Sequence, residues 1–503
     1  MTRVRGGPAP GQGDILAAFE AGRVEGFPGP ATCISTHLSH VFLAGERAAK
    51  LKRAVRLPFA DFSTLAAREA ACRAELALNR RTAPGLYLDV VPVTRGADGG
   101  FALGGGGEIA DWIVLMRRFP DGALFEEMAR AGRLSVGLVE ETAEAVARFH
   151  AGLPPVRAQG ACEPLGEVLA GLGRTAADGA RRHGIAAPPH ALFGALDARL
   201  AAIEGPLARR REAGAVRHGH GDLHLRNICL VDGRPTPFDA LEFDARLATG
   251  DVLYDLAFLL MDLRHHGLHA HANAALNRYW DVSGESEGAL ALVAPLMALR
   301  AVVRLAVSLE AGDAAAARSY GGLARDLTQT EEPRLVAIGG LSGTGKSLAA
   351  KSLAPLLPGP CGARLLRTDV LRKEGRGEGP LGREAYTDER RLGVYAALAE
   401  RAGAALAGTS AIADGTFRED EARARIAAVS PTFAGLWLHA PLEVRLARVA
   451  GRVADASDAT PEVAARQSEP DGLGPGWTRL PADGSPRATL ERACAVLGLP
   501  RPS

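Results

Sequence analysis

The sequence predicts two domains of different class: an α+β domain over residues 14–327, and an α/β domain with a parallel sheet over residues 334–503. The first observation is the length of 503 residues, which exceeds what one hydrophobic core normally holds. The second is a break in the pattern at "TQTEEP", residues 328–333. Before the break a strand-rich start leads into a helical body, and after it strands and helices alternate, as they do around parallel sheets.

Within the first domain, residues 38–52, "LSHVFLAGERAAKLK", alternate in hydrophobicity around a Gly-Glu turn, which predicts a hairpin. Residues 61–82 predict one helix, with Asp61 or Ser63 as its N-cap. The other elements expected here are strands over 87–95 and 111–118, a helical body over 134–310 and a strand pair around 226–240.

The composition is that of an ordinary globular protein, 47% hydrophobic and 23% charged, with a net charge of +1. A charge this close to neutral argues against a nucleic-acid or membrane-surface partner. The longest apolar stretch, "ALALVAPLMALRAVVRLAVSL", is interrupted by Arg300 and Arg304, so it predicts a buried helix and not a membrane span. The six cysteines form no CxxC pair and the N-terminus has no apolar signal segment, which favours a cytoplasmic protein without disulfides or structural zinc.

The stretch "GGLSGTGKS" contains the pattern G-x-x-x-x-G-K-S, from Gly340 to Ser347. It follows a predicted strand over 334–339 and opens a predicted helix, which is the context of a phosphate-binding loop. Glycines let backbone N–H groups surround phosphates, Lys346 neutralises the β- and γ-phosphates, and Ser347 ligates Mg²⁺. The residues predicted to bind ATP here are Gly340, Ser342, Gly343, Thr344, Gly345, Lys346 and Ser347.

Three later segments carry further side chains of the kind that phosphate chemistry uses. "TSAIADGTF" ends an apolar strand in Asp414, either a Mg²⁺ ligand, directly or through water, or a plain strand-end aspartate. "RTDVLRK" gives Asp369, which either acts on an acceptor hydroxyl or caps a helix. "EVRLARVAGR" places Arg445, Arg448 and Arg452 on one helical face. They form either a lid over phosphates, with Arg448 as the expected catalytic residue, or a solvated basic face.

With these motifs, residues 334–503 resemble the small P-loop kinases: gluconate kinase, the kinase domain of polynucleotide kinase, and zeta toxin. The resemblance rests on "GGLSGTGKS", "RTDVLR", "ADGTF" and "RLARVAGR" followed by "SDA". It implies a P-loop NTPase fold with ATP and Mg²⁺ as cofactors, and a kinase reaction.

The first domain contains "HGDLHLRN", residues 220–227, with an aspartate and an asparagine five residues apart. In kinases a catalytic aspartate takes or orients the acceptor proton, and an asparagine five residues later ligates Mg²⁺. Asp222 and Asn227 reproduce this spacing. A second metal-binding carboxylate is expected on the next strand. "PTPFDALEFD" supplies Asp239, with Glu242 and Asp244 as alternatives.

Residues 218–262 closely resemble the aminoglycoside phosphotransferase-like kinases, which share the protein-kinase-like fold. The resemblance implies a bilobal N-terminal domain and gives Asp251 and Asp255 a structural part in it. The chain departs from the family in having no convincing glycine-rich loop over the phosphates, and "HLSHVF", residues 37–42, is expected to replace it in part.

The same resemblance implies an ATP-binding lysine on the third strand. Lys50 in "AAK" is the first choice, and Lys52 on the same strand face is the alternative. A helix glutamate should pair with the lysine, with Glu75 as the first choice and Glu69 as the second. The adenine-binding hinge is expected at 115–119, "LMRRF".

A histidine-rich stretch, "HHGLHAH", residues 265–271, resembles a metal site in composition alone. It lies at the end of a predicted helix without a nearby cluster of carboxylates or cysteines, so it predicts a polar helix end or loop.

The pairing of the two halves resembles bacterial proteins described as bifunctional, in which an aminoglycoside phosphotransferase-like domain is fused to an ATP-binding P-loop domain. This implies two Mg²⁺-ATP sites in one chain that phosphorylate hydroxyl groups of small molecules. Two alternatives stay open. The P-loop domain regulates a single active kinase, or it acts as a zeta-toxin-like or polynucleotide-kinase-like enzyme, which the near-neutral charge disfavours.

Overall fold

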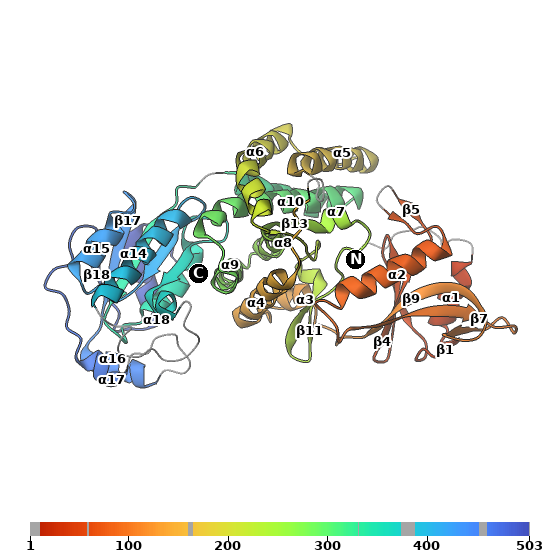
Figure 1. Cartoon of the computed structure of the whole chain (residues 1–503), viewed down its shortest axis with the longest axis horizontal. Coiled ribbons are helices and arrows are strands. Elements are labelled where there is room, and N and C mark those ends of the chain that lie inside the picture. Colours follow the sequence, from red (N-terminus) through yellow and green to blue (C-terminus); the bar gives the residue numbers. More distant parts are fainter. Residues whose placement is uncertain are drawn as a thin grey trace. The chain divides into compact units, whose positions relative to one another are not determined.

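The computed structural model describes residues 11–57, 60–158, 164–329, 331–373, 388–451 and 460–501. The chain forms two compact units (Figure 1). The first unit comprises Met1–His266 with Leu299–Gly322, and the second comprises Gly267–Ala298 with Leu323–Ser503. The sequence analysis predicted a single boundary between the two domains. In the structure, by contrast, the segment Gly267–Ala298 belongs to the same compact unit as the C-terminal half.

The first unit begins with a seven-stranded sheet in the order β1-β8-β7-β9-β4-β3-β2, antiparallel except for the parallel pair β1–β8. Helix α1 (Gln12–Glu20) buries Phe19 against one face of the sheet, where its ring stacks on Phe42. Helix α2 (Leu65–Asn79) covers the other face and buries Cys72 there (Figure 1). The strands are β1 Val24–Glu25, β2 Thr32–Ser35, β3 Ser39–Ala44, β4 Arg47–Lys52, β7 Tyr87–Arg95, β8 Phe101–Leu103 and β9 Glu108–Arg117.

The predicted hairpin over 38–52 is confirmed as β3 and β4, but the predicted start of the following helix is wrong. Helix α2 starts at Leu65, and its N-cap is Thr64, whose hydroxyl accepts the N–H of Ala67 at 3.2 Å. Asp61 lies instead in the short strand β6 (Ala60–Asp61), and its carboxylate accepts the N–H and hydroxyl of Ser63. Both predicted caps are therefore used in the turn that precedes the helix.

The helical body of the first unit surrounds two small antiparallel ribbons. The predicted strand pair is confirmed as β11 (Ile228–Val231) with β12 (Arg234–Pro237). The sequence did not predict the second ribbon, β10 (Val216–His218) with β13 (Thr249–Asp251). The helices that the site depends on are α4 Val136–Gly152, α6 His190–Glu212 and α8 Val252–His265. Strand-rich and helical lobes together give this unit the predicted protein-kinase-like arrangement.

One stretch of the described residues, Glu287–Glu310, is long and apolar enough to cross a membrane by length and composition. It contains the short helix η2 (Glu287–Leu292) and α10 (Val293–Glu310). The core helices of soluble proteins meet the same criterion, and 72% of its most apolar window is buried inside the structure. The predicted buried helix is therefore confirmed.

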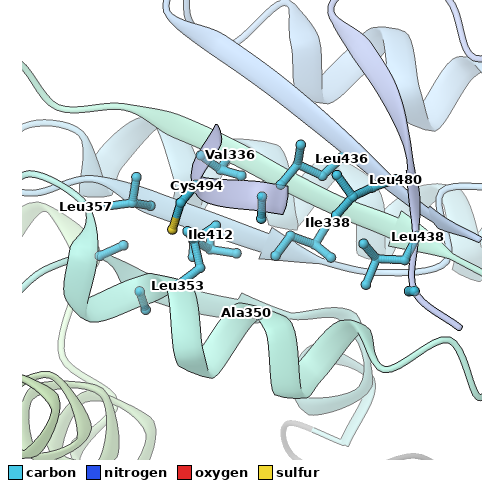
Figure 2. Close-up of a cluster of buried hydrophobic side chains, with 14 residues drawn as sticks. Val336, Ile338, Ala350, Leu353, Leu357, Ile412, Leu436, Leu438, Leu480 and Cys494 are labelled. Atoms are coloured by element: carbon cyan, nitrogen blue, oxygen red, sulfur yellow. The ribbon is translucent and has the colours of Figure 1, made fainter. Parts of the chain in front are cut away.

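The second unit contains a five-stranded sheet, all parallel, in the order β15-β16-β14-β17-β18. Side chains of the central strand, among them Val336 and Ile338, face Ala350 and Leu353 of helix α12 in one buried cluster (Figure 2). Because the predicted phosphate loop joins β14 to α12, this packing fixes both ends of the loop. The elements are β14 Leu335–Gly340, α12 Lys346–Leu353, β15 Arg364–Arg367, α13 Thr368–Lys373, α14 Asp388–Ala405, β16 Ala411–Asp414, α15 Asp420–Ala427, β17 Phe433–His439, α16 Leu442–Ala450, β18 Trp477–Pro481 and α18 Pro486–Leu497. The predicted α/β class is confirmed.

Helix α9 (His269–Ser283) covers the edge strand β15 of this sheet through two buried asparagines. Asn273 Nδ2 donates to the carbonyl of Ala363 at 2.9 Å, and Asn277 Nδ2 donates to the same carbonyl at 3.1 Å. Asn277 Oδ1 accepts the N–H of Leu365 at 2.7 Å. An edge strand leaves backbone groups without a partner strand. Here side-chain amides take the place of that strand.

Arg364 anchors the same interface through buried charge. Its guanidinium lies 2.7 Å from Asp281 Oδ1, and its Nε lies 3.0 Å from Glu287 Oε2. Burial would lower the pKa of Arg364, but the two carboxylates raise it above its ordinary value. Removing one partner from such a network leaves uncompensated charge in the interior, which is strongly destabilising.

We predict that Arg364→Met lowers the free energy of unfolding of the second unit by about 3 to 5 kcal/mol, because Asp281 and Glu287 then lack their cation. Chemical denaturation followed by the fluorescence of Trp437 and Trp477 measures the change. The control is Arg487→Met, which removes an exposed helix pair with Glu491 and should cost under about 1 kcal/mol. Equal losses in the two variants would contradict the prediction.

Candidate active sites

In the first unit the segment between β10 and β11 brings Asp222 and Asn227 together, as predicted. Asn227 Nδ2 donates to Asp222 Oδ2 at 2.8 Å and to the Asp222 carbonyl at 3.0 Å. His224 Nε2 lies 3.3 Å from the same Oδ2. Asp222 is therefore held on one side of its carboxylate by an amide and an imidazole.

The pKa of Asp222 lies well below its usual range. Burial alone would raise it, but His224, Arg304 and His220 together favour the charged form. Asp222 is thus a carboxylate at neutral pH and a weak base in the resting site.

Two aspartates of α8 hold the backbone of this segment. Asp255 accepts the N–H of His220 at 2.7 Å and that of Gly221 at 2.9 Å, while His150 Nε2 lies 3.1 Å away. Asp262 accepts the N–H of Leu225 at 2.9 Å. Both carboxylates are buried, so the loop that carries Asp222 is anchored to the core of the unit.

The family resemblance implied a structural role for Asp251 and Asp255. These contacts agree with that role. Asp251 caps α8 through the N–H of Leu253 and pairs with Arg210 of α6 at 2.7 Å. A Cβ on Gly219 would lie only 2.6 Å from Asp255 Oδ2, so the loop passes close over that carboxylate.

Asp239 is in the left-handed region, with φ of 61°, which is unusual for an aspartate. Its N–H donates to Tyr87 Oη at 3.1 Å, and the preceding residue, Phe238, donates its N–H to the carbonyl of Asn227 at 2.8 Å. These bonds bring the Asp239 backbone next to Asn227. The two predicted metal ligands therefore lie on neighbouring backbone segments, and their sharing of one metal site stays a prediction.

Both candidates for the ATP-binding lysine, Lys50 and Lys52, contact Glu75 of α2. Lys50 Nζ lies 2.7 Å from Glu75 Oε1 and 2.6 Å from Asp239 Oδ1. Lys52 Nζ lies 2.5 Å from Glu75 Oε2 and also pairs with Glu242. Lys50 is thus the lysine that reaches the predicted metal ligand.

The second choices from sequence have other partners. Glu69 pairs with Arg73 on the exposed side of α2, and Asp244 caps α7 (Ala245–Ala248) through the N–H of Arg246. The segment 37–42 covers the end of the β2–β3 turn and the first residues of β3, and Thr36 Oγ1 in that turn accepts the N–H of Ser39 at 3.0 Å. The proposed hinge at 115–119 covers the end of β9, and its role stays a prediction.

The donor set of the first site suits Mg²⁺ and a nucleotide. Asp222, Asn227 and Asp239 offer carboxylate and amide oxygens, the ligands that a hard cation prefers. The side chain of Asp239 is 40% exposed, so it is accessible to a ligand although Lys50 contacts it. Lys50 would meet the phosphates, and Asn227 and Asp239 would hold the metal.

In the second unit the loop after β14 has the backbone of a phosphate cradle. Gly340, Gly343 and Gly345 have φ of 142°, 86° and 89°, a region closed to most residues. A Cβ on Gly343 would lie 2.4 Å from the carbonyl of Arg445, so the loop packs directly on α16. Lys346 Nζ donates to the carbonyl of Leu341 at 3.0 Å across the loop. Turned N–H groups at a helix start suit phosphate oxygens.

Ser347 and Asp414 meet as expected for metal ligands. Ser347 Oγ donates to Asp414 Oδ2 at 2.7 Å, and burial raises the pKa of Asp414 above its ordinary value. The sequence analysis missed a third residue there: Arg367, at the end of β15, donates to Ser347 Oγ at 3.2 Å and lies 3.4 Å from Asp414 Oδ2. The only hint of Arg367 in the sequence was its position directly before Thr368 and Asp369. These oxygens fit Mg²⁺.

Asp369 is the second residue of α13 and accepts a hydrogen bond from Arg372 Nη1 at 3.0 Å, so it lies inside the helix and does not cap it. Two of the three arginines predicted to form a lid, Arg445 and Arg448, lie among the described residues, and they have different partners. Arg445 is buried and donates to the carbonyl of Ala464 at 3.1 Å, and Arg452 lies outside the described residues.

Arg448 donates to the carbonyls of Ala482 and Gly484, at 2.7 and 3.0 Å. It also lies near the phosphate loop, since a Cβ on Gly345 would be 4.0 Å from its Nη1. These contacts tie it to the segment after β18, and its catalytic role stays a prediction.

Gln467 was also missed by the sequence analysis, since a lone glutamine carries no motif. Its Oε1 accepts the N–H of Ser342 at 2.7 Å, and its Nε2 donates to Ser342 Oγ at 3.1 Å. Ser342 was predicted to bind ATP. Its N–H is thus held by a side-chain oxygen, in the way that it would be held by a phosphate oxygen.

The histidine-rich stretch lies at helix ends, as predicted, because α8 ends at His265 and α9 begins at His269. The ring of His265 stacks on Tyr320, with centroids 3.8 Å apart. Within the described ranges, no group of three or more histidine, cysteine, aspartate or glutamate side chains gathers as a metal site.

A pH dependence follows from Asp255, whose pKa lies well below its ordinary value of about 3.9. Burial would raise this pKa, but the hydrogen bond and charge of His150, with His220 and Arg300, lower it. A carboxyl group with a lowered folded-state pKa stabilises the fold above its unfolded pKa, and the stabilisation is lost as pH falls below that value.

We therefore predict that the free energy of unfolding falls from about pH 5 downward and that Asp255→Asn makes this slope shallower. Urea denaturation at a series of pH values measures the slope. Asp121→Asn, at an exposed surface pair with Arg118, is the control and should keep the wild-type slope. An unchanged slope in Asp255→Asn would refute the assignment.

Comparisons with known proteins agree with this division of the chain. Residues 335–469 match a family model described as an AAA domain. The uncharacterized proteins Rv2004c of Mycobacterium tuberculosis (strain H37Rv) and Mb2027c of Mycobacterium bovis are each 32% identical over 452 residues. These alignments cover 86% of this chain and 88% of each relative, so they span both units.

Similar solved structures include a gluconokinase from Sinorhizobium meliloti 1021, with 21% identity, 34% of this chain and 94% of that chain covered, and a TM-score of 0.27. A choline/ethanolamine kinase family protein from Mesorhizobium loti has 16% identity, with 64% and 96% covered and a TM-score of 0.38. The chain belongs to the family of the two mycobacterial proteins, with a protein-kinase-like unit and a P-loop unit.

Proposed function

We propose that the chain is an ATP-dependent phosphotransferase with one Mg²⁺-ATP site in each unit and small-molecule hydroxyl groups as acceptors. The observation that carries the proposal is that Lys50 of β4 contacts Asp239, 189 residues further along the chain. The neighbour of Asp239, Phe238, bonds the Asn227 backbone, and Asn227 in turn bonds Asp222. The net charge of +1 gives no reason to invoke a nucleic-acid acceptor.

In the first site Asp222 positions the acceptor hydroxyl. Its Oδ2 is engaged by Asn227 and His224, so we assign Oδ1 to the hydroxyl proton. Because the pKa of Asp222 is low, the carboxylate orients the hydroxyl and takes its proton only as the new phosphorus–oxygen bond forms. Bound Mg²⁺-ATP would supply the phosphoryl group and the charge neutralisation that this chemistry needs.

In the second site the chain contributes mainly a phosphate-binding loop, and to a lesser degree a residue that takes the acceptor proton. The backbone from Gly340 to Ser347 would surround the phosphates, with Lys346 and Arg448 on the transferring group and Ser347 and Asp414 on the metal. Asp369 would meet the acceptor hydroxyl, with Arg372 holding its carboxylate. Gluconokinase and choline kinase are the activities named for similar structures. We infer for this chain only the common class, an alcohol acceptor.

Asp222→Asn keeps the shape of the first site but removes the charge that orients the hydroxyl. We expect the acceptor-dependent turnover of this site to fall by about 10² to 10⁴-fold while ATP binding persists. ATP consumption, screened against sugars, amino sugars, amino alcohols and nucleosides, measures the change. Asp178→Asn, at an exposed pair with Arg181, is the control and should match wild type. An active Asp222→Asn variant would refute the role.

Lys346→Ala removes the phosphate-binding cation of the second site. We expect it to abolish a separate acceptor-dependent activity and to leave the activity lost in Asp222→Asn intact. The same acceptor screen measures both. If Lys346→Ala removes no acceptor-dependent activity and only changes how ATP controls the first site, the P-loop unit is regulatory and the two-enzyme proposal is wrong.

A further inference from the structure

Five charged side chains of the first unit form a continuous series with alternating sign: Asp239, Lys50, Glu75, Lys52 and Glu242. The ion pairs along it measure 2.6 Å from Asp239 to Lys50, 2.7 Å from Lys50 to Glu75, and 2.5 Å from Glu75 to Lys52, and Lys52 also pairs with Glu242. The series starts and ends in one loop, residues 239–242. Its middle members lie on β4 and α2.

Exposure differs sharply along the series. The side chains of Asp239 and Lys50 are 40% and 13% exposed, whereas Lys52 is 1% exposed and Glu75 is wholly buried. Lys52 Nζ lies 5.6 Å from the ring centroid of Phe62, and the Lys52 carbonyl accepts Gln12 Nε2 at 2.9 Å. Only the Asp239–Lys50 end is open to a ligand. Lys52 is therefore no substitute for Lys50 in contacting a nucleotide.

Glu75 and Glu242 both depend on Lys52 for a compensating positive charge. The pKa of Glu75 stays below its ordinary value although burial would raise it, because Lys50 and Lys52 both favour its charged form. If Lys50 turns from Asp239 and Glu75 toward phosphate, Lys52 is the cation that remains on Glu75. Without Lys52, Glu75 and Glu242 would be two buried carboxylates that repel each other.

The loop 239–242 needs the same support. Its backbone is held at three successive residues: the N–H of Asp239 by Tyr87 Oη, that of Ala240 by Asn79 Oδ1, and that of Leu241 by the carbonyl of His220. Glu242 ties this loop to β4 through Lys52, beside the tie of Asp239 to Lys50, and it is the tie that stays if Lys50 turns toward phosphate. That tie joins a strand of the sheet to the loop that carries the metal ligand Asp239.

We propose that Lys52 is a positioning residue of the first site: it holds Glu75 and the 239–242 loop in place, so that Lys50 and Asp239 are available to phosphate and metal. This rests on the proposed function of the first unit as a nucleotide site. Lys52 itself touches neither ligand. Its effect on nucleotide binding passes through Glu75 on one side and Glu242 on the other.

A double-mutant cycle separates this role from direct binding, because coupled residues give non-additive effects. The readout is the dissociation constant for a fluorescent ATP analogue with Mg²⁺, in the full chain with Lys346→Ala to silence the second site. We expect Lys52→Met to weaken binding by about tenfold or more. Adding Glu242→Gln should restore binding to within a few-fold of the Glu242→Gln chain, because the repulsion with Glu75 is then gone.

Lys50→Met is the comparison variant. It should lose binding of the ATP analogue whether or not Glu242→Gln is also present. Arg73→Met, an exposed cation of α2, is the matched control and should bind as the parent does. Two results would overturn the inference: Lys52→Met binding the analogue normally, or the double variant staying as weak as Lys52→Met.

Should Lys52→Met not fold, Glu242→Gln alone decides, with a several-fold weaker affinity expected and an unchanged affinity contradicting the proposal. If the Lys346→Ala parent binds no analogue at all, the proposed function of the first unit fails, and that result is distinct from both outcomes above.

Discussion

Buried carboxylates that must stay charged determine the geometry of the first unit's site. In the first unit Asp255 can lie in the core only because two backbone N–H groups and His150 surround it, and this fixes the loop that carries Asp222. Glu75 is likewise buried as a charged group, and two lysines compensate its charge. A charge in the interior without such partners costs several kcal/mol. The positions of Asp222 and Lys50 are thus consequences of how their neighbours' charges are satisfied.

The two proposed nucleotide sites rely on different physical means. The first relies on side chains from β4, α2 and two loops, so its geometry depends on long-range ion pairs such as Lys50 with Asp239. The second relies on backbone N–H groups between β14 and α12, where glycine φ values of 86° and 89° set the shape locally. The P-loop site therefore has a continuous sequence signature, whereas the first site is assembled from separate segments.

This difference explains what the sequence could predict. The "HGDLHLRN" spacing and the phosphate-loop pattern could be found because each lies in one short stretch, and Asp414 could be singled out because it ends a strand with a clear apolar pattern; their roles stay predictions. Lys50 and Lys52 could not be separated, since both face the same side of β4, and only burial distinguishes them. Arg367 and Gln467 carry no motif, and their contacts with Ser347 and Ser342 are tertiary.

The attachment of α9 to β15 was beyond sequence reasoning for a similar reason. Asn277 meets Ala363 and Leu365 across 86 and 88 residues, and nothing in the local pattern links those positions. The predicted boundary near residue 330 followed composition and periodicity along the chain. The structure adds that Gly267–Ala298, which precedes that boundary, completes the edge of the parallel sheet.

The central claim is that one chain carries two independent nucleotide sites. The most direct test is the stoichiometry of binding of a non-hydrolysable ATP analogue with Mg²⁺, measured by equilibrium dialysis on the full chain. The account predicts two molecules per chain for wild type, one for Lys50→Met, one for Lys346→Ala and none for the double variant. A wild-type stoichiometry of one, lost completely in either single variant, would contradict it.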